Sequence, residues 1–358
     1  MEKEIFEQPN VLINSISSIL SDKGKIDINL KKIGIKDKKG IMISAAGTSF
    51  YAAIVAKYWI EKISNVFVSV ELASEYRYRS PSNSGLSSMI VISQSGESID
   101  TLMAMREAKK LKLKTTAIVN VEGSTIDREA DYTLYTRVGP EIGVASTKSF
   151  TSQLTVLFLL ALKLANENKS INFKEYHDLI KYIKYLPTAL SKCLKINDQI
   201  IEIAQKIKNT SNTLFLGRGY LYPLALEGAL KLKEISYIHA EGFAAGEMKH
   251  GPIALIEENL PVIMFLISDG LEDKAISNLQ EAVSRGAKTI LIGDKKSIKK
   301  AKFVNFAIEI PEFEKKFSSI FSPIFMAIPA QLLAYHVARE RGTDVDQPRN
   351  LAKSVTVE

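Results

Sequence analysis

The sequence predicts an α/β fold of two tandem, doubly wound parallel-sheet domains followed by a carboxy-terminal tail. Short apolar runs of strand length alternate with stretches of helix length, which is typical of a parallel sheet buried on both faces. The pattern then begins again: Gly47-Thr-Ser-Phe opens the first predicted helix, and Gly217-Arg-Gly-Tyr opens its counterpart. The chain has 358 residues, 46% of them hydrophobic, so it can bury two cores. An ordered internal repeat of this kind indicates duplicated domains.

In the first half, apolar runs predict the strands of one sheet, and longer segments between and after them predict helices. The strands are expected at residues 40–46, 66–72, 88–93, 115–120 and 132–136. The helices are expected at residues 48–63, 98–111 and 146–168, the last of them long and apolar.

The second half repeats this order after a charged helical segment at residues 169–206, which we expect to be interrupted at Pro187. Strands are expected at 213–217, 261–268, 289–293 and 304–310, and helices at 220–237, 273–285 and 316–341. The predicted organisation is a lead-in segment (1–35), a first domain (36–170), a helical connector (171–206), a second domain (207–343) and a tail (344–358).

Composition and charge disfavour several classes of protein. The net charge is +7, but the basic residues are scattered and lack the interleaved aromatics of a single-strand nucleic-acid binder. An apolar stretch at 154–162 is closed by Lys163 before it reaches the length of a membrane helix, and the first twenty residues do not form a signal peptide. Cys193 is the single cysteine and is expected to be buried in a helix. We therefore expect a cytoplasmic protein with neither a nucleic-acid nor a membrane partner.

A loop rich in hydroxyl groups, Ser93-Gln-Ser-Gly-Glu-Ser98, follows the third predicted strand and opens a helix. The free N–H groups and positive dipole end of a helix N-terminus bind anions, and Gly96 permits close backbone approach. Ser98 alone would be an ordinary helix cap. The loop offers more polar side chains than a cap requires, and no lysine of a nucleotide-triphosphate loop is present. It is therefore predicted to bind the phosphate of a small metabolite, through Ser93, Gln94, Ser95 and Ser98.

Two further segments are expected near this loop. Thr48 and Ser49 follow the first predicted strand, and ligands of a doubly wound sheet collect at the carboxyl ends of adjacent strands. Residues 141–149 precede the next helix and either close the same pocket or only begin that helix. The halves differ at the phosphate loop, because the matching strand of the second half ends in Ile267-Ser-Asp-Gly270.

Glu227, Lys231 and Glu234 are spaced by four and three residues on a predicted helix, so they share one face. Such residues usually form a ladder of surface ion pairs. Apolar flanks here favour a position near a core or cleft, where a carboxylate and an ammonium can move protons. His239 and His250 are expected in the loop region that follows, and His250 is a candidate catalytic group.

Lys353 lies near the carboxy terminus, in an alternating apolar stretch that follows a turn-rich segment at 344–350. A frayed end is the usual state of a terminal segment, but this composition predicts a docked one. A docked lysine can attack a sugar carbonyl as its neutral amine.

Together with the stretches 227–241 and 246–252, these motifs resemble the glucosamine-6-phosphate synthase family, the glutamine–fructose-6-phosphate aminotransferases. The likeness is to the isomerase half of that family, which has two sugar isomerase (SIS) domains of flavodoxin-like topology, and it covers the chain from residue 4 onward. It implies aldose–ketose isomerisation of fructose 6-phosphate toward glucosamine 6-phosphate through a lysine Schiff base. This chemistry belongs to amino-sugar and UDP-N-acetylglucosamine precursor synthesis and needs no metal or organic cofactor.

The resemblance also implies a role for each matching residue. Lys353 would form the Schiff base, and Glu234 would move a proton between C1 and C2 with Lys231 as the nearby cation. His250 would open the sugar ring, reaching in from the partner subunit of a homodimer. The phosphate and the sugar would be bound by Thr48, Ser49, Ser93, Gln94, Ser95, Ser98 (usually threonine in the family), Val144, Ser146 and Ala352.

One feature of the family is missing. Its full-length enzyme begins with a glutaminase domain whose first residue is cysteine, and Cys193, in mid-chain, cannot replace that residue. The chain is therefore expected to be the isomerase part of a larger enzyme, or a stand-alone glucosamine-6-phosphate deaminase. A non-catalytic module that senses sugar phosphates is disfavoured, because a sensor does not need Glu234, His250 and Lys353.

Overall fold

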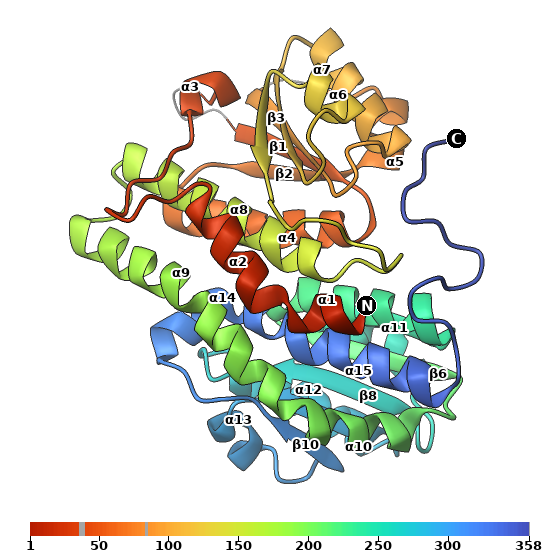
Figure 1. Cartoon of the computed structure of the whole chain (residues 1–358). Coiled ribbons are helices and arrows are strands. Elements are labelled where there is room, and N and C mark those ends of the chain that lie inside the picture. The colour runs from red at the N-terminus through yellow and green to blue at the C-terminus, as the bar shows by residue number, and fades with distance from the viewer. Residues whose placement is uncertain (36–39, 83–84, 358) are drawn as a thin grey trace. The chain divides into compact units, whose positions relative to one another are not determined.

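The computed structural model describes residues 1–35, 40–82 and 85–357, so residues 36–39 of the predicted first domain and Glu358 of the predicted tail lie outside the described residues. The chain folds into two compact units. The first unit contains Glu7–Glu141, Lys148–Pro187 and Ala352–Glu358, and the second contains Met1–Phe6, Ile142–Thr147 and Thr188–Leu351. Each unit contains a five-stranded parallel sheet (Figure 1).

The sheet of the first unit has the strand order β2-β1-β3-β4-β5, with every pair parallel. The winding direction reverses between β1 and β3, whose carboxyl ends lie side by side with Ala45 opposite Ile92. Doubly wound sheets bind their ligands at such a reversal. The strands are β1 (Gly40–Ala45), β2 (Val68–Leu72), β3 (Leu86–Ser93), β4 (Lys114–Val119) and β5 (Tyr132–Tyr135).

Helices cover both faces of this sheet, because its strands are apolar on both faces (Figure 1). On one face Met89 and Val91 pack with Met105 of α6. On the other face α4 packs on the sheet and α8 packs on α4, where Trp59 meets Phe158 edge to face with ring centroids 5.2 Å apart. The helices are α2 (Gln8–Ser17), α3 (Leu30–Ile33), α4 (Gly47–Ser64), α5 (Ala73–Tyr76), η1 (Arg77–Arg79), α6 (Ile99–Lys110), α7 (Thr125–Glu129), α8 (Lys148–Glu167) and α9 (Phe173–Cys193), the last shared with the second unit.

The second unit repeats this topology. Its strand order, β10-β9-β8-β6-β7, is the order of the first sheet read in the opposite direction. Phe215 and Phe265 lie on the face covered by α11, with ring centroids 6.2 Å apart and Gly228 packed on them. This confirms the predicted fold class and the internal repeat. The strands are β6 (Asn212–Gly217), β7 (His239–Ala244), β8 (Pro261–Leu266), β9 (Lys288–Gly293) and β10 (Phe306–Glu309).

The helices of the second unit include one at the start of the chain. They are α1 (Glu2–Phe6), η2 (Leu194–Ile196), α10 (Asn197–Ile207), α11 (Leu221–Ser236), η3 (Glu247–His250), η4 (Pro252–Leu255), α12 (Glu272–Val283), α13 (Lys295–Lys300), α14 (Lys315–Phe325) and α15 (Ala327–Glu340).

Three predicted elements differ from the structure. α9 runs through Pro187, because burial of the side chains on either side outweighs the loss of one backbone hydrogen bond. The predicted closing helix is two helices that meet at Met326, since Pro329 has no N–H to continue the ladder there. His239 lies at the start of β7 and not in a loop, because that segment pairs with β6 along its whole length.

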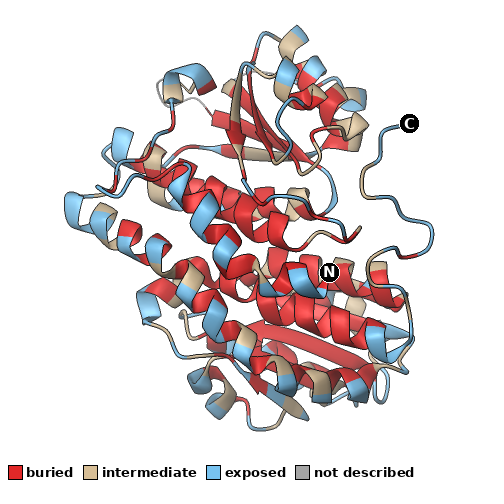
Figure 2. Cartoon of the chain, in the orientation of Figure 1, coloured by how far each residue is buried: buried red, intermediate tan, exposed pale blue. Residues whose placement is uncertain are grey.

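Two helical segments are long and apolar enough to cross a membrane by length and composition, Lys148–Glu167 and Lys315–Glu340. The prediction that Lys163 closes the apolar stretch 154–162 short of this length is wrong, because a single lysine does not end the apolar character of α8. In both segments 89% of the most apolar window is buried inside the protein (Figure 2), as in the core helices of a globular fold. Cys193 is buried at the end of α9, as predicted.

Candidate functional site

The Ser93–Ser98 loop joins β3 to α6 at the carboxyl edge of the first sheet, and its side chains are held by hydrogen bonds. Ser93 Oγ accepts a hydrogen bond from the Gly96 N–H at 3.1 Å and lies 3.0 Å from Ser98 Oγ. Ser95 Oγ accepts one from the Glu97 N–H at 3.1 Å. Gly96 has a φ of 69°, and a Cβ atom there would lie 2.0 Å from the Ser124 hydroxyl oxygen. The loop therefore requires glycine at this position and presents its hydroxyl groups in fixed places.

Ser98 occupies the N-cap position of α6, but its side chain makes no capping hydrogen bond. A capping serine normally accepts a hydrogen bond from an N–H group in the first turn. Here the Ser98 hydroxyl pairs with the Ser93 hydroxyl at the N-terminus of α6. This hydroxyl therefore does not act as an ordinary helix cap, and its role in binding phosphate stays a prediction.

Thr48 and Ser49 lie in the first turn of α4, directly after β1. Gly47 opens that helix with a φ of 53°, and the Thr48 side chain is buried while Ser49 is half-buried. Because β1 and β3 are neighbours, these hydroxyl groups and the Ser93–Ser98 loop lie at the same edge of the same sheet. The expected grouping is present, and contact with a sugar phosphate stays a prediction.

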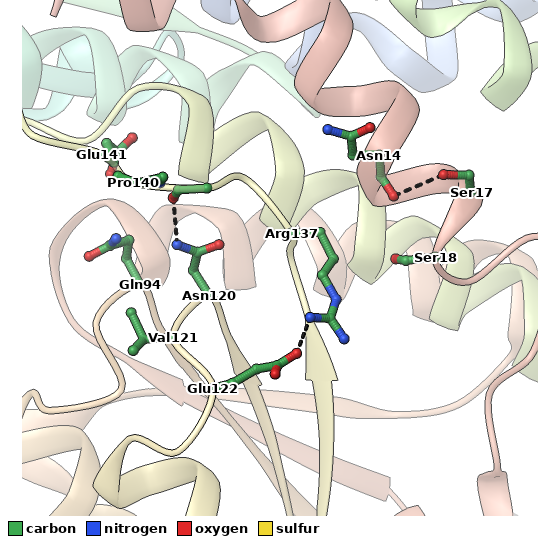
Figure 3. Close-up of a pocket in the computed structure, with 11 residues that line it drawn as sticks. Asn14, Ser17, Ser18, Gln94, Asn120, Val121, Glu122, Arg137, Pro140 and Glu141 are labelled. Carbon is green, nitrogen blue, oxygen red and sulfur yellow. Dashed lines mark hydrogen bonds and ion pairs between the residues drawn. The ribbon is translucent and has the colours of Figure 1, made fainter.

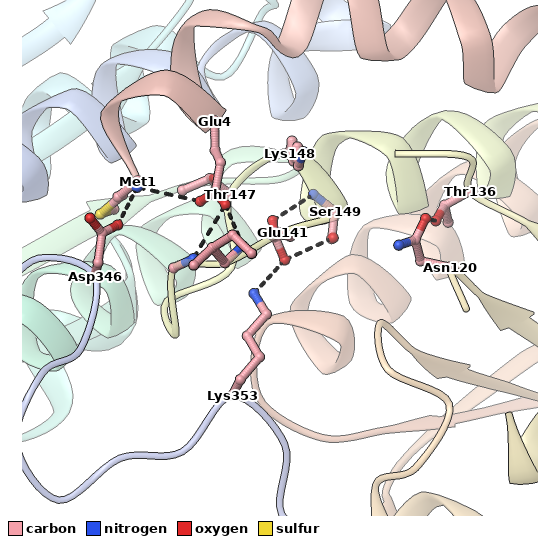
Figure 4. A network of polar contacts seen from close by, with 12 residues as sticks. Met1, Glu4, Asn120, Thr136, Glu141, Thr147, Lys148, Ser149, Asp346 and Lys353 are labelled. Carbon is pink, nitrogen blue, oxygen red and sulfur yellow. Dashed lines mark hydrogen bonds and ion pairs between the residues drawn. The ribbon is translucent and has the colours of Figure 1, made fainter. Parts of the chain in front are cut away.

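Polar contacts attach the carboxy-terminal tail to the first unit. Lys353 Nζ donates a hydrogen bond to Glu141 Oε2 at 2.6 Å (Figure 4). The carbonyl of Val355 accepts one from the Ile99 N–H, at the start of α6, at 3.0 Å. Ala352 is exposed, and the side chains of Val355 and Val357 are also exposed. The tail is docked as predicted, but through an ammonium group and a carbonyl and not through its apolar side chains.

Glu141 is a residue whose role the sequence did not reveal. Its side chain is fully buried. Oε1 accepts a hydrogen bond from the Ser149 N–H at 3.1 Å, and Oε2 accepts one from the Ser149 hydroxyl at 2.9 Å (Figure 4). Ser149 lies in the first turn of α8, whose dipole stabilises a carboxylate at this end. The segment at 141–149 therefore both begins a helix and places a carboxylate against the tail.

A cavity of about 850 Å³ opens in the first unit, lined in part by Gln94 and Glu141 (Figure 3). This volume lies in the range of small-molecule sites. Asn120 also lines it and donates a hydrogen bond to the Gly139 carbonyl at 2.8 Å, and Arg137 forms an ion pair with Glu122 on the same wall. Asn120 directly follows β4, so the signal that could have found it was a polar residue at the carboxyl end of a central strand.

In the second unit, Lys231 lies between two carboxylates of α11. Its Nζ is 2.6 Å from Glu234 Oε2 and 3.7 Å from Glu227 Oε1. The side chains of Lys231 and Glu227 are each 1% exposed, whereas that of Glu234 is 20% exposed. The alternative of a surface ion-pair ladder is therefore wrong, because buried charges persist only with close partners. Glu234 is the member of this cluster that a ligand can reach.

The other predicted residues of the second unit, His250, Val144 and Ser146, lie outside its α-helices and strands. His250 ends the short turn η3 and is exposed. Val144 and Ser146 are half-buried, and the Val144 N–H donates to the Asp346 carbonyl at 3.0 Å. Arg349 stacks over the Tyr237 ring at 4.2 Å, which fixes the segment that leads to the tail.

The predicted site residues thus fall into two groups, one in each unit. The first unit contains Thr48, Ser49, Ser93, Gln94, Ser95, Ser98, Ala352 and Lys353, and the second contains Val144, Ser146, Lys231, Glu234 and His250. Within the ranges that the structure describes, no three His, Cys, Asp or Glu residues are grouped as a metal site would require.

Comparison with known proteins identifies relatives of the chain. The family model described as SIS domain matches residues 34–163 and 206–341. A glutamine–fructose-6-phosphate aminotransferase (isomerizing) of Zymomonas mobilis subsp. mobilis is 50% identical over 362 residues, which cover 100% of this chain and 59% of that protein. The chain therefore spans about three fifths of the length of the curated relatives it matches.

Two solved structures are similar over nearly the whole chain. The C-terminal domain of glucosamine-fructose-6-phosphate aminotransferase from Francisella tularensis is 44% identical, with a TM-score of 0.90, covering 97% of this chain and 98% of that one. The glucosamine-6-phosphate deaminase from Thermotoga maritima is 25% identical, with a TM-score of 0.77, covering 99% and 98%.

Proposed function

The chain belongs to the SIS domain family, and from this membership we propose that it is the isomerase part of a glutamine–fructose-6-phosphate aminotransferase. In that role it converts fructose 6-phosphate toward glucosamine 6-phosphate for amino-sugar synthesis. The observation that carries the proposal is the contact of Lys353 with Glu141 at 2.6 Å, in the unit that also contains the Ser93–Ser98 loop. A lysine nucleophile and an anion-binding loop on one unit are what a sugar phosphate needs for Schiff-base chemistry.

Substrate binding is assigned to the carboxyl edge of the first sheet. Ser93, Ser95 and Ser98 donate hydrogen bonds to the phosphate at the N-terminus of α6, and Thr48 and Ser49 add hydroxyl groups from α4. On the basis of the family resemblance, contacts with the sugar are assigned to Val144, Ser146 and Ala352. Hydrogen bonds from neutral donors to a phosphate dianion contribute mainly to affinity, so this set determines how tightly the substrate binds.

The chemical steps are assigned to four side chains. His250 opens the sugar ring, and the Lys353 amine adds to the C2 carbonyl to form an imine after loss of water. The imine is then hydrolysed to the open-chain ketose, or ammonia displaces the Lys353 nitrogen from C2. Glu234 takes the proton from C1 of the released ketose or ketimine and returns it to C2, giving glucose 6-phosphate or glucosamine 6-phosphate. Lys231 remains beside Glu234 at 2.6 Å, so its positive charge faces the carboxylate before the first transfer and after the second.

The nitrogen source and the oligomer are part of the same proposal. A glutaminase domain, which the family resemblance implies for the full-length enzyme, supplies ammonia, and without it the chain uses free ammonia or only isomerises. The protein acts in the cytoplasm as a homodimer in which His250 serves the site of the partner subunit. Mixing inactive His250→Ala and Lys353→Ala subunits then restores part of the activity, and a mixture that stays inactive would contradict the shared site.

The direct test of the proposal is chemical trapping. Fructose 6-phosphate and borohydride are added to the chain, and peptide mass spectrometry locates the reduced adduct. We expect the sugar adduct on Lys353 and formation of glucose 6-phosphate without borohydride. Absence of both the adduct and the isomerised product would refute the proposed function.

A stand-alone deaminase is the second candidate, favoured by the likeness to the Thermotoga maritima deaminase over 98% of that chain. The direction in which the reaction runs distinguishes the two functions. A deaminase releases ammonia from glucosamine 6-phosphate at a rate comparable to its isomerase turnover. The isomerase part of a synthase releases it far more slowly than it interconverts the hexose phosphates.

A further inference from the structure

We propose that Glu141 positions the Lys353 amine and accepts its proton as the amine attacks the sugar, an inference that rests on the proposed function. Glu141 Oε2 lies 2.6 Å from Lys353 Nζ, across 212 residues of sequence. The carboxylate has no solvent exposure, whereas the lysine side chain is 25% exposed. A buried carboxylate that holds a partly exposed lysine side chain is arranged to present its amine to a ligand.

A second ion pair of the first unit shows the opposite arrangement. Glu7 Oε1 is also 2.6 Å from a lysine nitrogen, that of Lys148. There the lysine side chain is only 4% exposed and the glutamate is 30% exposed. The Glu7–Lys148 pair buries its cation and can only hold structure together, whereas the Glu141–Lys353 pair keeps its amine within reach of a ligand.

The surroundings of Glu141 fix its two oxygen atoms separately. Oε1 accepts the Ser149 N–H, and Oε2 accepts both the Ser149 hydroxyl and Lys353 Nζ. Because one oxygen is bonded to the backbone of α8, the carboxylate cannot rotate away from the lysine without losing that bond. Glu141 also lines the cavity of about 850 Å³ that contains Gln94 on its wall. The carboxylate that holds the amine therefore also borders a space large enough for a hexose phosphate.

The proton transfers balance in this arrangement. Lys353 begins as an ammonium and Glu141 as a carboxylate. The ammonium gives one proton to Glu141, and the neutral amine adds to the C2 carbonyl, forming the C–N bond while the carbonyl oxygen becomes the carbinolamine hydroxyl. Glu141 then returns its proton to that hydroxyl, which leaves as water as the protonated imine forms. Glu141 ends as a carboxylate, ready for hydrolysis of the imine by the reverse path.

The experiment measures the rate of adduct formation on Lys353 with fructose 6-phosphate and borohydride, the Kd of fructose 6-phosphate and thermal unfolding. Three variants are compared with the wild-type chain: Glu141→Gln, Glu141→Asp and, as matched control, Glu7→Gln. Removal of one acid–base group slows a reaction by roughly 10²-fold or more. We expect Glu141→Gln to slow trapping by about that factor with a Kd within about threefold of wild type. Glu141→Asp keeps the charge and should regain part of the rate, and Glu7→Gln should trap at the wild-type rate.

The outcomes separate this inference from the proposed function. A wild-type chain that gives neither a Lys353 adduct nor glucose 6-phosphate overturns both, and one that isomerises without a Lys353 adduct overturns the role of Glu141 alone. A normal adduct in the wild type, formed equally fast in Glu141→Gln, overturns the role of Glu141 alone, as does an aspartate variant that is no faster than the glutamine variant. If Glu141→Gln does not fold, Ser149→Ala tests the same point, because it keeps the carboxylate but removes the hydroxyl that orients it. Slower trapping in Ser149→Ala supports the inference, and an unchanged rate overturns it.

Discussion

The loops that follow β3 and β8 occupy equivalent places in the two sheets but use their polar groups in opposite ways. After β3, serine hydroxyl groups surround the start of α6. After β8, carboxylates take the free N–H groups: Asp269 Oδ1 accepts from the Leu271 N–H at 2.9 Å, and Glu272 Oε2 accepts from the Gly270 N–H at 2.6 Å. An anion entering the second loop would meet negative charge where the first loop offers donors. The shared topology therefore provides two equivalent positions, and the loop residues make only the first suitable for phosphate.

The one carboxylate in the first loop supports this contrast. Glu97 accepts a hydrogen bond from the Thr125 N–H at 2.8 Å, so its charge is directed to α7 and not to the start of α6. Hydrogen bonds from Thr125 hold the pKa of Glu97 below its usual value. Ser268, in contrast, has both its N–H and its hydroxyl committed to Asp294, at 2.6 and 3.0 Å. The N–H and hydroxyl donors of Ser268 are therefore already used within the second unit and are not directed to a ligand.

The largest expected effect comes from substitution of Lys353, the predicted nucleophile in the first unit. Lys353→Ala should lower isomerase turnover by at least about 10³-fold, because no other amine replaces a covalent nucleophile. Fructose 6-phosphate should still bind, as measured by isothermal titration calorimetry. Lys300→Ala is the matched control, since Lys300 pairs with Glu272 and Asp273 beside the second loop. Unchanged turnover in Lys353→Ala would rule out the Schiff base.

The hydroxyl groups of the first loop should determine affinity. Ser95→Ala and Ser98→Ala are each expected to weaken fructose 6-phosphate binding by roughly 10-fold or more, because a hydrogen bond to a charged group contributes about 1.5–3 kcal/mol. Ser268→Ala, in the equivalent loop, should leave the Kd unchanged. Titration calorimetry with each variant decides the point. A loss of turnover with normal affinity in the two first-loop variants would contradict the phosphate assignment.

Gly96 should be essential for the shape of the first loop. A Cβ atom at Gly96 would overlap Ser124, whereas one at Gly123, with nearly the same φ of 72°, would meet no atom within 4 Å. Gly96→Ala should therefore cost about 1–3 kcal/mol more free energy of unfolding than Gly123→Ala. Urea unfolding of both variants measures the difference. Equal losses would show that Ser124 moves aside and that the loop is less rigid than its contacts indicate.

The smallest expected effect is a loss of stability at lower pH, which should be greater in the second unit than in the first. In the second unit, His336 Nε2 lies 2.7 Å from Asn197 Oδ1. Burial, and after it the positive charge of Arg339, lowers the pKa of His336. The unfolded chain then binds this proton more readily than the folded one, so the stability that His336 contributes is full above about pH 6.5 and is lost as pH falls toward the folded pKa.

In the first unit, burial raises the pKa of Asp131, but hydrogen bonds from Thr115 together with the positive charges of Lys114 and Lys109 outweigh it and leave the pKa below the usual value. Its contribution is therefore lost only below about pH 4. Hydrogen exchange at pH 7.5 and 5.5 should show the second unit opening more readily at the lower pH, and His336→Gln should remove that change. A first unit that weakens as much as the second over this interval would contradict the assignment.

Some elements were predictable from sequence because their signals are local. The buried strands and the helix starts after β1, β3 and β6 follow from apolar periodicity and from glycine and serine placed at strand ends. β7 was missed because its sequence, His239–Ala244, lacks the β-branched residues of a strand and is ordered by pairing with β6. The break at Met326 was missed because apolar residues continue through it.

The sequence by itself determined the fold class, the repeat and the hydroxyl-rich character of one loop, since each depends on residues within a few positions of one another. The tertiary structure decided which charged groups act together. It buried Lys231 between two carboxylates, and it brought Lys353 to Glu141 across 212 residues. It also showed that the second loop uses its own acids to satisfy its N–H groups. The contacts within α11 and within the second loop are local, and the tertiary structure decided only their burial and use. The pairing of Lys353 with Glu141 depends on where the sheet order places distant segments, and no local pattern of residues encodes that order.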